Sequence, residues 1–212
     1  RFYTTHSLFD LYYKDLNNSK KIIKNINLRL IGEHNILNAS ASIAVCLNLG
    51  VKVKIIKKAL RNFSGVQRRM TKIFEKNGNE FFDDYAHHPT EISSILEGVN
   101  KVYNKRKIIS VFEPHRYSRI RSLKQAFSKS FIKSDLVLIC PVYAAGEKKV
   151  LSFNLLNFAK LISKNSKTQT IIVKNQKELS NYFKKNLIND EIIIGMGAGL
   201  ISRWMRELKL SL

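Results

Sequence analysis

Short apolar runs alternate with longer amphipathic stretches from residue 107 to the end of the chain. The runs are rich in β-branched residues, as buried parallel strands are, and they cover residues 107–112, 136–140, 170–173 and 191–195. The stretches after them have helical periodicity, at about residues 120–132, 153–164, 176–186 and 199–210. Ser152 is the expected N-cap of the second helix. This alternation predicts an α/β fold with a mostly parallel sheet and right-handed crossovers.

A hairpin precedes this region. Residues 69–86 have the pattern of two strands around Asn77-Gly78, a dipeptide typical of tight hairpin turns. The second strand closes on "DDYAHHPTE", and Pro89 suits the first turn of a helix that continues from Thr90 to about Tyr103. The titratable residues of this segment therefore lie where a strand passes into a helix, at the sheet edge where open α/β folds place their chemistry.

The first 65 residues differ in character. Strand-like pieces at residues 1–3, 11–13 and 21–30 lead into a helix that starts in "GEHNILN", and a second helix covers about residues 53–62. Gly65 marks a joint, so we predict one domain over residues 1–65 and another over 66–212.

Composition adds a large positive charge, +21 over 212 residues. Such a charge favours nucleic acid or anionic surfaces, and a basic α/β nucleic-acid-binding module is one hypothesis. The lysines are scattered in pairs without aromatic interleaving, however, so we favour solvated lysine-rich faces and no nucleic-acid partner. An anionic small substrate is compatible with both interpretations.

No apolar run is long enough to span a bilayer, and the first residues do not resemble a signal peptide. We therefore expect a cytoplasmic protein without a membrane span. The chain begins with Arg rather than Met, and we expect it to be a fragment. Cys46 and Cys140 lie in apolar surroundings without metal or disulfide spacing, so neither indicates a redox role.

The strand at 107–112 ends in "EPHRYSRIR", which places Glu113 and His115 in the loop after it. Arg116 and Arg119 are three residues apart, so near a helix start both guanidinium groups can bind one carboxylate or phosphate. The alternative is a solvated pair, but cations are unfavourable at a helix N-terminus. Anion binding is therefore the preferred interpretation.

Amide and carboxylate side chains can bind a nucleotide, although the spacing of the amides alone slightly favours an ordinary helix start. Asn35 and Asn38 share one helix face beside His34, and paired amides can bind a planar heterocycle; the alternative is an ordinary helix N-cap with a surface Asn. Asp84 can bind a ribose or a metal-nucleotide complex, or it caps the helix after Pro89.

Two apparent motifs predict no ligand. His87 and His88 are adjacent, so an extended chain points them to opposite faces, which argues against a shared metal ion. "GMGAG" lacks the dinucleotide fingerprint because the third glycine position falls on Leu200; Gly199 is expected to ease packing between strand and helix.

Six segments in order resemble the Mur ligase family, ATP-dependent amide-forming enzymes of peptidoglycan synthesis. They are "GEHNILNASAS", "FSGVQRRM", "DDYAHHPTE", "EPHRYSRIR", "PVYAAGE" and "GMGAG", and the resemblance covers about residues 28–200. Family members have a UDP-sugar domain, a central ATP-binding domain and a Rossmann-like C-terminal domain. The P-loop is absent here, so the resemblance implies the end of the central domain at 1–65 and the C-terminal domain at 66–212, inactive alone.

The resemblance also implies a reaction. "EPHRYSR" favours members that add L-alanine to UDP-N-acetylmuramate over those that recycle murein tripeptide, which remain an alternative. In such members ATP phosphorylates the muramate carboxylate, and the alanine amine attacks the acyl phosphate with help from Mg²⁺. The resemblance places the main Mg²⁺ ligands in the missing part, and no metal ligand in this chain.

Site residues follow from the same resemblance. It implies an ATP-binding set, namely His34, Asn35, Asn38, Arg69 and Asp84. It implies an L-alanine-binding set, namely Tyr85, His87, His115, Arg116 and Arg119. His87, Arg116 and Arg119 are the expected catalytic residues.

Overall fold

The computed structural model describes residues 3, 6–103, 105–150 and 152–212. The chain folds into two compact units. Unit 1 comprises residues 1–65 and 97–104, and unit 2 comprises residues 66–96 and 105–212. Among the described residues, no helix has both the length and the apolar character needed to cross a membrane.

Unit 1 contains an antiparallel pair of strands, β1 (Ser7–Lys14) and β2 (Lys20–Leu28), and two helices, α1 (Glu33–Asn48) and α2 (Val53–Asn62). Both helices were predicted. β1 is longer than the predicted piece at 11–13, because the exposed positions along the strand hide the alternation. β2 lies close to the predicted piece at 21–30, but it begins at Lys20 and ends at Leu28. The piece at 1–3 lies mostly outside the described residues. Four isoleucines form the small core, Ile23, Ile26, Ile43 and Ile56.

Unit 2 is built on a six-stranded sheet with the order β3-β4-β8-β5-β6-β7. Its strands are β3 (Thr71–Lys76), β4 (Asn79–Asp84), β5 (Ile108–Phe112), β6 (Leu136–Ile139), β7 (Gln169–Ile172) and β8 (Ile192–Met196). Only β3 is antiparallel to its neighbour, and it pairs with β4 across the predicted Asn77-Gly78 turn. The predicted α/β class with a mostly parallel sheet is confirmed.

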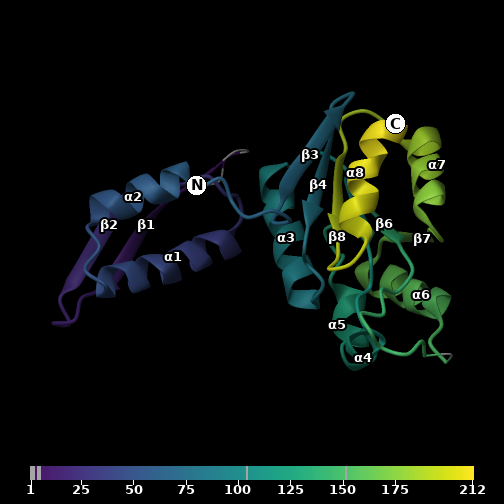
Figure 1. Cartoon of the computed structure of the whole chain (residues 1–212), viewed down its shortest axis with the longest axis horizontal. Coiled ribbons are helices and arrows are strands. Elements are labelled where there is room, and N and C mark those ends of the chain that lie inside the picture. Colours follow the sequence, from purple (N-terminus) through teal and green to yellow (C-terminus); the bar gives the residue numbers. More distant parts are fainter. Residues whose placement is uncertain (1–2, 4–5, 104, 151) are drawn as a thin grey trace. The chain divides into compact units, whose positions relative to one another are not determined.

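Helices cover this sheet. They are α3 (Pro89–Val102), α4 (Tyr117–Ser122), α5 (Lys124–Lys129), α6 (Leu155–Ser166), α7 (Gln176–Asn186) and α8 (Ile201–Ser211). In Figure 1, α8 lies along β4 and β8, and its buried Ile201, Met205 and Leu208 join the core cluster of the sheet. Apolar burial of this kind contributes most of the stability of such a layered domain.

Two helix predictions need correction. The helix expected at 120–132 is split into α4 and α5 at Leu123, whose backbone (φ −112°, ψ 19°) leaves the helical region. The N-cap of α6 is Asn154 rather than Ser152, since the Asn154 side chain accepts a hydrogen bond of 2.9 Å from the Asn157 amide. Both residue types are good caps, so sequence alone does not fix which is used.

The cysteines are free thiols. Cys140 is buried in the core, as predicted, and burial raises the pKa of its thiol. Cys46 is only half-buried and packs against the core of unit 1.

Candidate functional site

The carboxyl ends of four neighbouring strands form one row. Asp84 of β4 is paired with Met196 of β8, Met196 with Phe112 of β5, and Phe112 with Ile139 of β6. The loops that follow these strands therefore start side by side, although they are far apart in the sequence. This edge brings together the unit 2 residues expected to bind the amino acid.

Four aromatic rings lie in a series along this edge. The centroid of the His87 ring is 5.2 Å from that of Tyr85 and 5.3 Å from that of His115. The His115 ring is in turn stacked on Tyr143, with centroids 5.4 Å apart and an interplanar angle of 27°. Tyr143 was not among the predicted site residues; its place in "PVYAAGE", after β6, is the signal that could have found it.

The two histidines present different nitrogen chemistry. Nδ1 of His87 lies 2.9 Å from the backbone oxygen of Tyr85, which can only accept, so Nδ1 carries a proton, and Nε2 is the acceptor whenever the ring is neutral. Nδ1 of His115 lies 3.1 Å from Nη1 of Arg119, which can only donate, so Nδ1 accepts and Nε2 carries the proton. The edge thus offers one imidazole acceptor and one imidazole donor.

Burial lowers the pKa of His115 to about 4, and the charges of His87, Arg119 and Arg116 act in the same direction. His115 is therefore neutral near pH 7, which keeps its Nδ1 available to Arg119.

Both arginines lie at the start of α4, as predicted. Arg116 is the N-cap, with a φ of 68°; its amide donates to the Tyr143 carbonyl at 2.9 Å and its side chain is exposed. Arg119 follows within the first turn. Glu147 places a negative charge at this helix start, beside the two arginines. Its carboxylate accepts hydrogen bonds from the amide of Ser118 at 3.1 Å and from the Ser118 hydroxyl. These hydrogen bonds lower the pKa of Glu147.

Asp84 is almost completely buried, and each of its carboxylate oxygens accepts a backbone hydrogen bond, from Ala86 at 2.7 Å and from Met70 at 2.8 Å. Burial raises its pKa to about 6, against the opposing effects of these hydrogen bonds and of the Arg69 charge. The carboxylate thus holds the backbone around the end of β4, and its contact with a nucleotide stays a prediction. Arg69 is exposed beside it.

The alternative in which Asp84 caps the following helix is wrong. Glu91 accepts from the amides of His87 and His88 at 3.0 and 3.1 Å, and His88 Nδ1 accepts from the amide of Thr90 at 3.4 Å. This is a capping-box arrangement at the start of α3. The adjacent histidines make different contacts, and in the described part of the chain no three His, Cys, Asp or Glu side chains form a group suited to a metal ion.

His34, Asn35 and Asn38 lie on α1 in unit 1, so the structure leaves them unplaced relative to the edge of the unit 2 sheet. The N-cap of α1 is Gly32 (φ 98°), so the alternative in which one of the three caps the helix is wrong. Asn35 donates an amide hydrogen to the Ile31 carbonyl at 2.7 Å, which leaves its oxygen free to accept; Asn38 is exposed.

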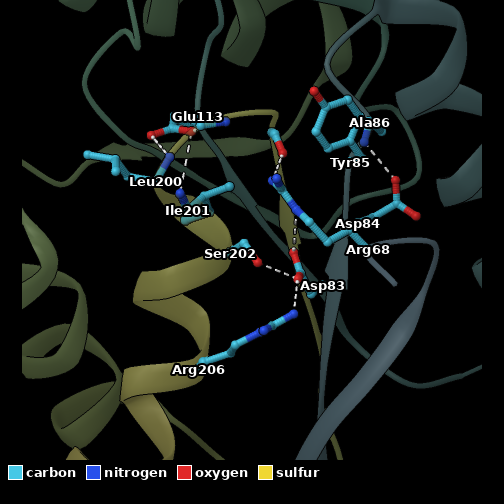
Figure 2. A network of polar contacts seen from close by, with 12 residues as sticks. Arg68, Asp83, Asp84, Tyr85, Ala86, Glu113, Leu200, Ile201, Ser202 and Arg206 are labelled. Carbon is cyan, nitrogen blue, oxygen red and sulfur yellow. Dashed lines mark hydrogen bonds and ion pairs between the residues drawn. The ribbon is translucent and has the colours of Figure 1, made fainter. Parts of the chain in front are cut away.

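The place of Glu113 in "EPHRYSRIR" led us to expect its side chain in the loop after β5. This expectation is wrong, because the side chain points into the protein. It is 4% exposed, and its carboxylate accepts from the amides of Gly199 and Leu200 at 3.0 Å each and of Ile201 at 3.4 Å (Figure 2). Its pKa is raised by burial, against these hydrogen bonds. Glu113 therefore fills the helix N-terminus where a dinucleotide fold binds pyrophosphate, which agrees with the failed fingerprint in "GMGAG".

Close packing explains Gly199. A Cβ at this position would lie 2.5 Å from Cγ of Tyr143 and 2.6 Å from Oε2 of Glu113. Gly199 does permit close packing, but against the side chains of Tyr143 and Glu113 rather than between a strand and a helix as expected. The Tyr143 ring that it accommodates is the one stacked on His115.

A cleft of about 430 Å³ is lined by residues of α4 and of the loop before α6. Tyr117, Phe153 and Phe158 contribute aromatic surface to it, and Arg121 and Lys124 line it as well. Its lining contains none of the predicted site residues.

Comparison with known proteins agrees with this geometry. The model of the family described as "Mur ligase, glutamate ligase domain" matches residues 68–199. The chain is 47% identical over 203 residues to a UDP-N-acetylmuramate–L-alanine ligase of Pelagibacter ubique, covering 96% of this chain and 44% of the relative. It is 38% identical over 190 residues to the ligase of that name from Vesicomyosocius okutanii, covering 88% of this chain and 40% of the relative.

Solved structures give the same picture. A UDP-N-acetylmuramate–alanine ligase of Thermotoga maritima superposes with a TM-score of 0.73 at 25% identity, over 99% of this chain and 43% of that one. A murein peptide ligase of Psychrobacter arcticus shares the fold, with a TM-score of 0.68 at 24% identity. The match covers 98% of this chain and 42% of that one. The chain spans less than half the length of these relatives.

The family model covers more than half of the chain, and the matched residues contain the whole row of strand ends described above. The chain therefore belongs to the Mur ligase family.

Proposed function

We propose that the protein containing this chain is an ATP-dependent ligase of peptidoglycan synthesis that joins L-alanine to UDP-N-acetylmuramate in the cytoplasm. The identity to two relatives of that name supports the substrates. The observation that carries the proposal is the convergence of His87, His115, Arg116 and Arg119 at one sheet edge.

The edge has the chemistry needed for an α-amino acid. Arg116 and Arg119 supply cationic donors for a carboxylate, and Nε2–H of the neutral His115 supplies another donor. Tyr85, 37% exposed, and Tyr143 flank the two imidazoles and add aromatic surface that a small apolar side chain can contact. We assign L-alanine to this position, with the arginines on its carboxylate.

His87 has the geometry of a proton acceptor. An ammonium group cannot attack a carbonyl carbon, so the alanine amine must lose a proton before or during attack. The amine nitrogen bonds to the carbonyl carbon of the acyl phosphate, the bond from that carbon to the phosphate oxygen breaks, and Nε2 of His87 receives the proton. The Tyr85 carbonyl keeps the other ring nitrogen protonated.

The residues of unit 1 fit the nucleotide. The Asn35 side-chain oxygen and the exposed Asn38 amide, beside His34, offer the mixed donors and acceptors that adenine requires. Arg69 supplies a cation for phosphate oxygens, and Asp84 is assigned to the nucleotide as well. When bound, ATP supplies the phosphoryl group that activates the muramate carboxylate, and Mg²⁺ neutralises charge on it.

The full-length protein provides the test. Arg116→Ala and Arg119→Ala should each raise the KM for L-alanine about tenfold or more, because a hydrogen bond to a charged group contributes about 1.5–3 kcal/mol. Arg121→Ala is the matched control on the same helix, since Arg121 is exposed and lines the cleft that contains none of the predicted site residues. An unchanged KM in both site variants would overturn the assignment. Ligation of murein tripeptide in place of L-alanine would favour the recycling enzymes instead.

A further inference from the structure

Arg68 lies in the segment between residue 65 and β3, which begins at Thr71. Its φ is 60°, in the left-handed region that arginine rarely adopts. Its backbone oxygen accepts a hydrogen bond of 2.8 Å from the amide of Tyr85. The unusual backbone is thus held against the end of β4, beside the row of aromatic rings.

The side chain of Arg68 makes three further contacts (Figure 2). Its guanidinium lies over the ring of Tyr85, 4.6 Å from the centroid, and Nη2 donates to the Gly197 carbonyl at 2.6 Å. Nε lies 3.8 Å from Oδ1 of Asp83. One planar cation therefore joins the site tyrosine, the loop after β8 and a buried carboxylate.

Asp83 anchors this arrangement. Its side chain is fully buried, and Oδ2 accepts from the Ser202 hydroxyl at 2.5 Å and pairs with Nη2 of Arg206 at 3.4 Å. Both partners come from α8, so Asp83 is fixed whether or not Arg68 is present. A buried carboxylate that faces a cation holds that cation in one direction.

We propose that Arg68 is a positioning residue for the amino-acid site: held by Asp83 and Gly197, it fixes the Tyr85 ring against His87. This proposal rests on the function assigned above to Tyr85 and His87. Arg68 does not contact the substrate; it acts through the ring that does. The Arg68 side chain also connects the segment between residue 65 and β3 to this sheet edge. A change in the backbone of that segment would therefore remove the contact between Arg68 and the Tyr85 ring.

Kinetics of the full-length protein test the proposal. Arg68→Ala should raise the KM for L-alanine about fivefold, as expected for an interaction of about 1 kcal/mol, and leave the KM for ATP unchanged. Arg68→Lys keeps the charge but not the planar fork, and should fall in between. If Arg68 acts through Tyr85, the variant carrying Arg68→Ala and Tyr85→Ala should be no worse than Tyr85→Ala alone.

Arg106→Ala is the matched control. Arg106 is about as buried as Arg68, with side chains 17% and 23% exposed. It also contacts carbonyls and a carboxylate, but at the opposite sheet edge, where it pairs with Glu80 and donates to the Glu191 carbonyl. It should lower stability without raising the KM for L-alanine.

A spectroscopic measurement on the chain separates this proposal from the function. The chain has five histidines, so the imidazole NMR signal of His87 can be assigned, and Arg68→Ala should shift it by moving the Tyr85 ring while Arg106→Ala should not. An unshifted His87 signal, or additive effects of Arg68→Ala and Tyr85→Ala on the KM, would overturn the positioning role. Failure of the parent enzyme to use L-alanine, with the His87 shift present, would overturn the function and not the contact.

Discussion

The imidazole rings of His87 and His115 lie 5.3 Å apart and carry their protons on opposite ring nitrogens. The backbone carbonyl of Tyr85 fixes the tautomer of His87, and the guanidinium of Arg119 fixes that of His115. The proposed function gives these two chemically identical side chains separate roles, as proton acceptor and as donor to an anion.

Exchanging each histidine should therefore affect different kinetic constants. His87→Gln should lower kcat about a hundredfold, because general-base catalysis contributes about 10²–10⁴, with a small change in the KM for L-alanine. His115→Gln should mainly raise that KM. Steady-state kinetics of the full-length protein distinguishes them, and equal effects on kcat would contradict separate roles.

The stability of unit 2 should depend on pH through two opposing groups. The pKa of His115 falls from 6.5 to about 4 on folding, so the unfolded chain binds more protons here and stability is lost as pH falls from 6.5 towards 4. The pKa of Asp84 rises from 3.8 to about 6, so the folded chain binds more protons and stability is lost as pH rises from 3.8 to 6.

Removing one of the two groups should leave only the pH dependence of stability that the other group causes. Between pH 4 and 6, Asp84→Asn should make stability rise more steeply with pH, and His115→Gln should make it fall with pH. Urea unfolding followed by fluorescence of Trp204, the single tryptophan of the chain, reports on unit 2. Parallel pH profiles for the two variants would contradict the assignment.

Removal of the Glu113 carboxylate should destabilise unit 2. Glu113→Ala leaves the first amides of α8 without acceptors, at a cost of about 2–3 kcal/mol. Glu113→Gln keeps one acceptor oxygen and should cost less. The same Trp204 unfolding measurement applies. Glu178→Ala is a control, because that residue accepts an exposed amide hydrogen bond from Lys174 at the start of α7; equal losses would argue against a special role for the buried cap.

Gly199→Ala should damage both packing and site. The added methyl group has no room beside Tyr143, so we expect a loss of about 1–3 kcal/mol and a raised KM for L-alanine as the ring moves off His115. Leu200→Ala, at the neighbouring exposed position, should leave the KM unchanged. A stable variant with normal KM would show that Tyr143 does not support the site.

Local sequence patterns predicted most of the elements but not their order in space. β-branched runs and turn dipeptides depend on neighbouring residues, so β5 to β8 and the Asn77-Gly78 turn were found. Hydrophobic periodicity does not show the break at Leu123, where a single residue leaves the helical region. It also does not decide between Ser152 and Asn154, because both residue types are good caps.

The site shows the same division. The carboxyl ends of parallel strands lie at the same edge of a sheet. The sequence therefore predicted that Tyr85, His87, Arg116 and Arg119 lie close to one another. The direction of the Glu113 side chain was not predictable, because its partners are backbone amides more than 80 residues later in the sequence. Arg68 was missed for a related reason: its role depends on a left-handed backbone and on Asp83, neither of which forms a motif.

The position of β8 has a consequence for protein synthesis. This strand is made after all the other strands, yet it is the one that pairs with both β4 and β5. A ribosome that has completed β7 has therefore released two groups of strands with no direct pairing between them. The sheet of unit 2 can close only when the last strand emerges, so an interrupted translation product exposes unpaired strand edges and becomes a substrate for chaperones and proteases.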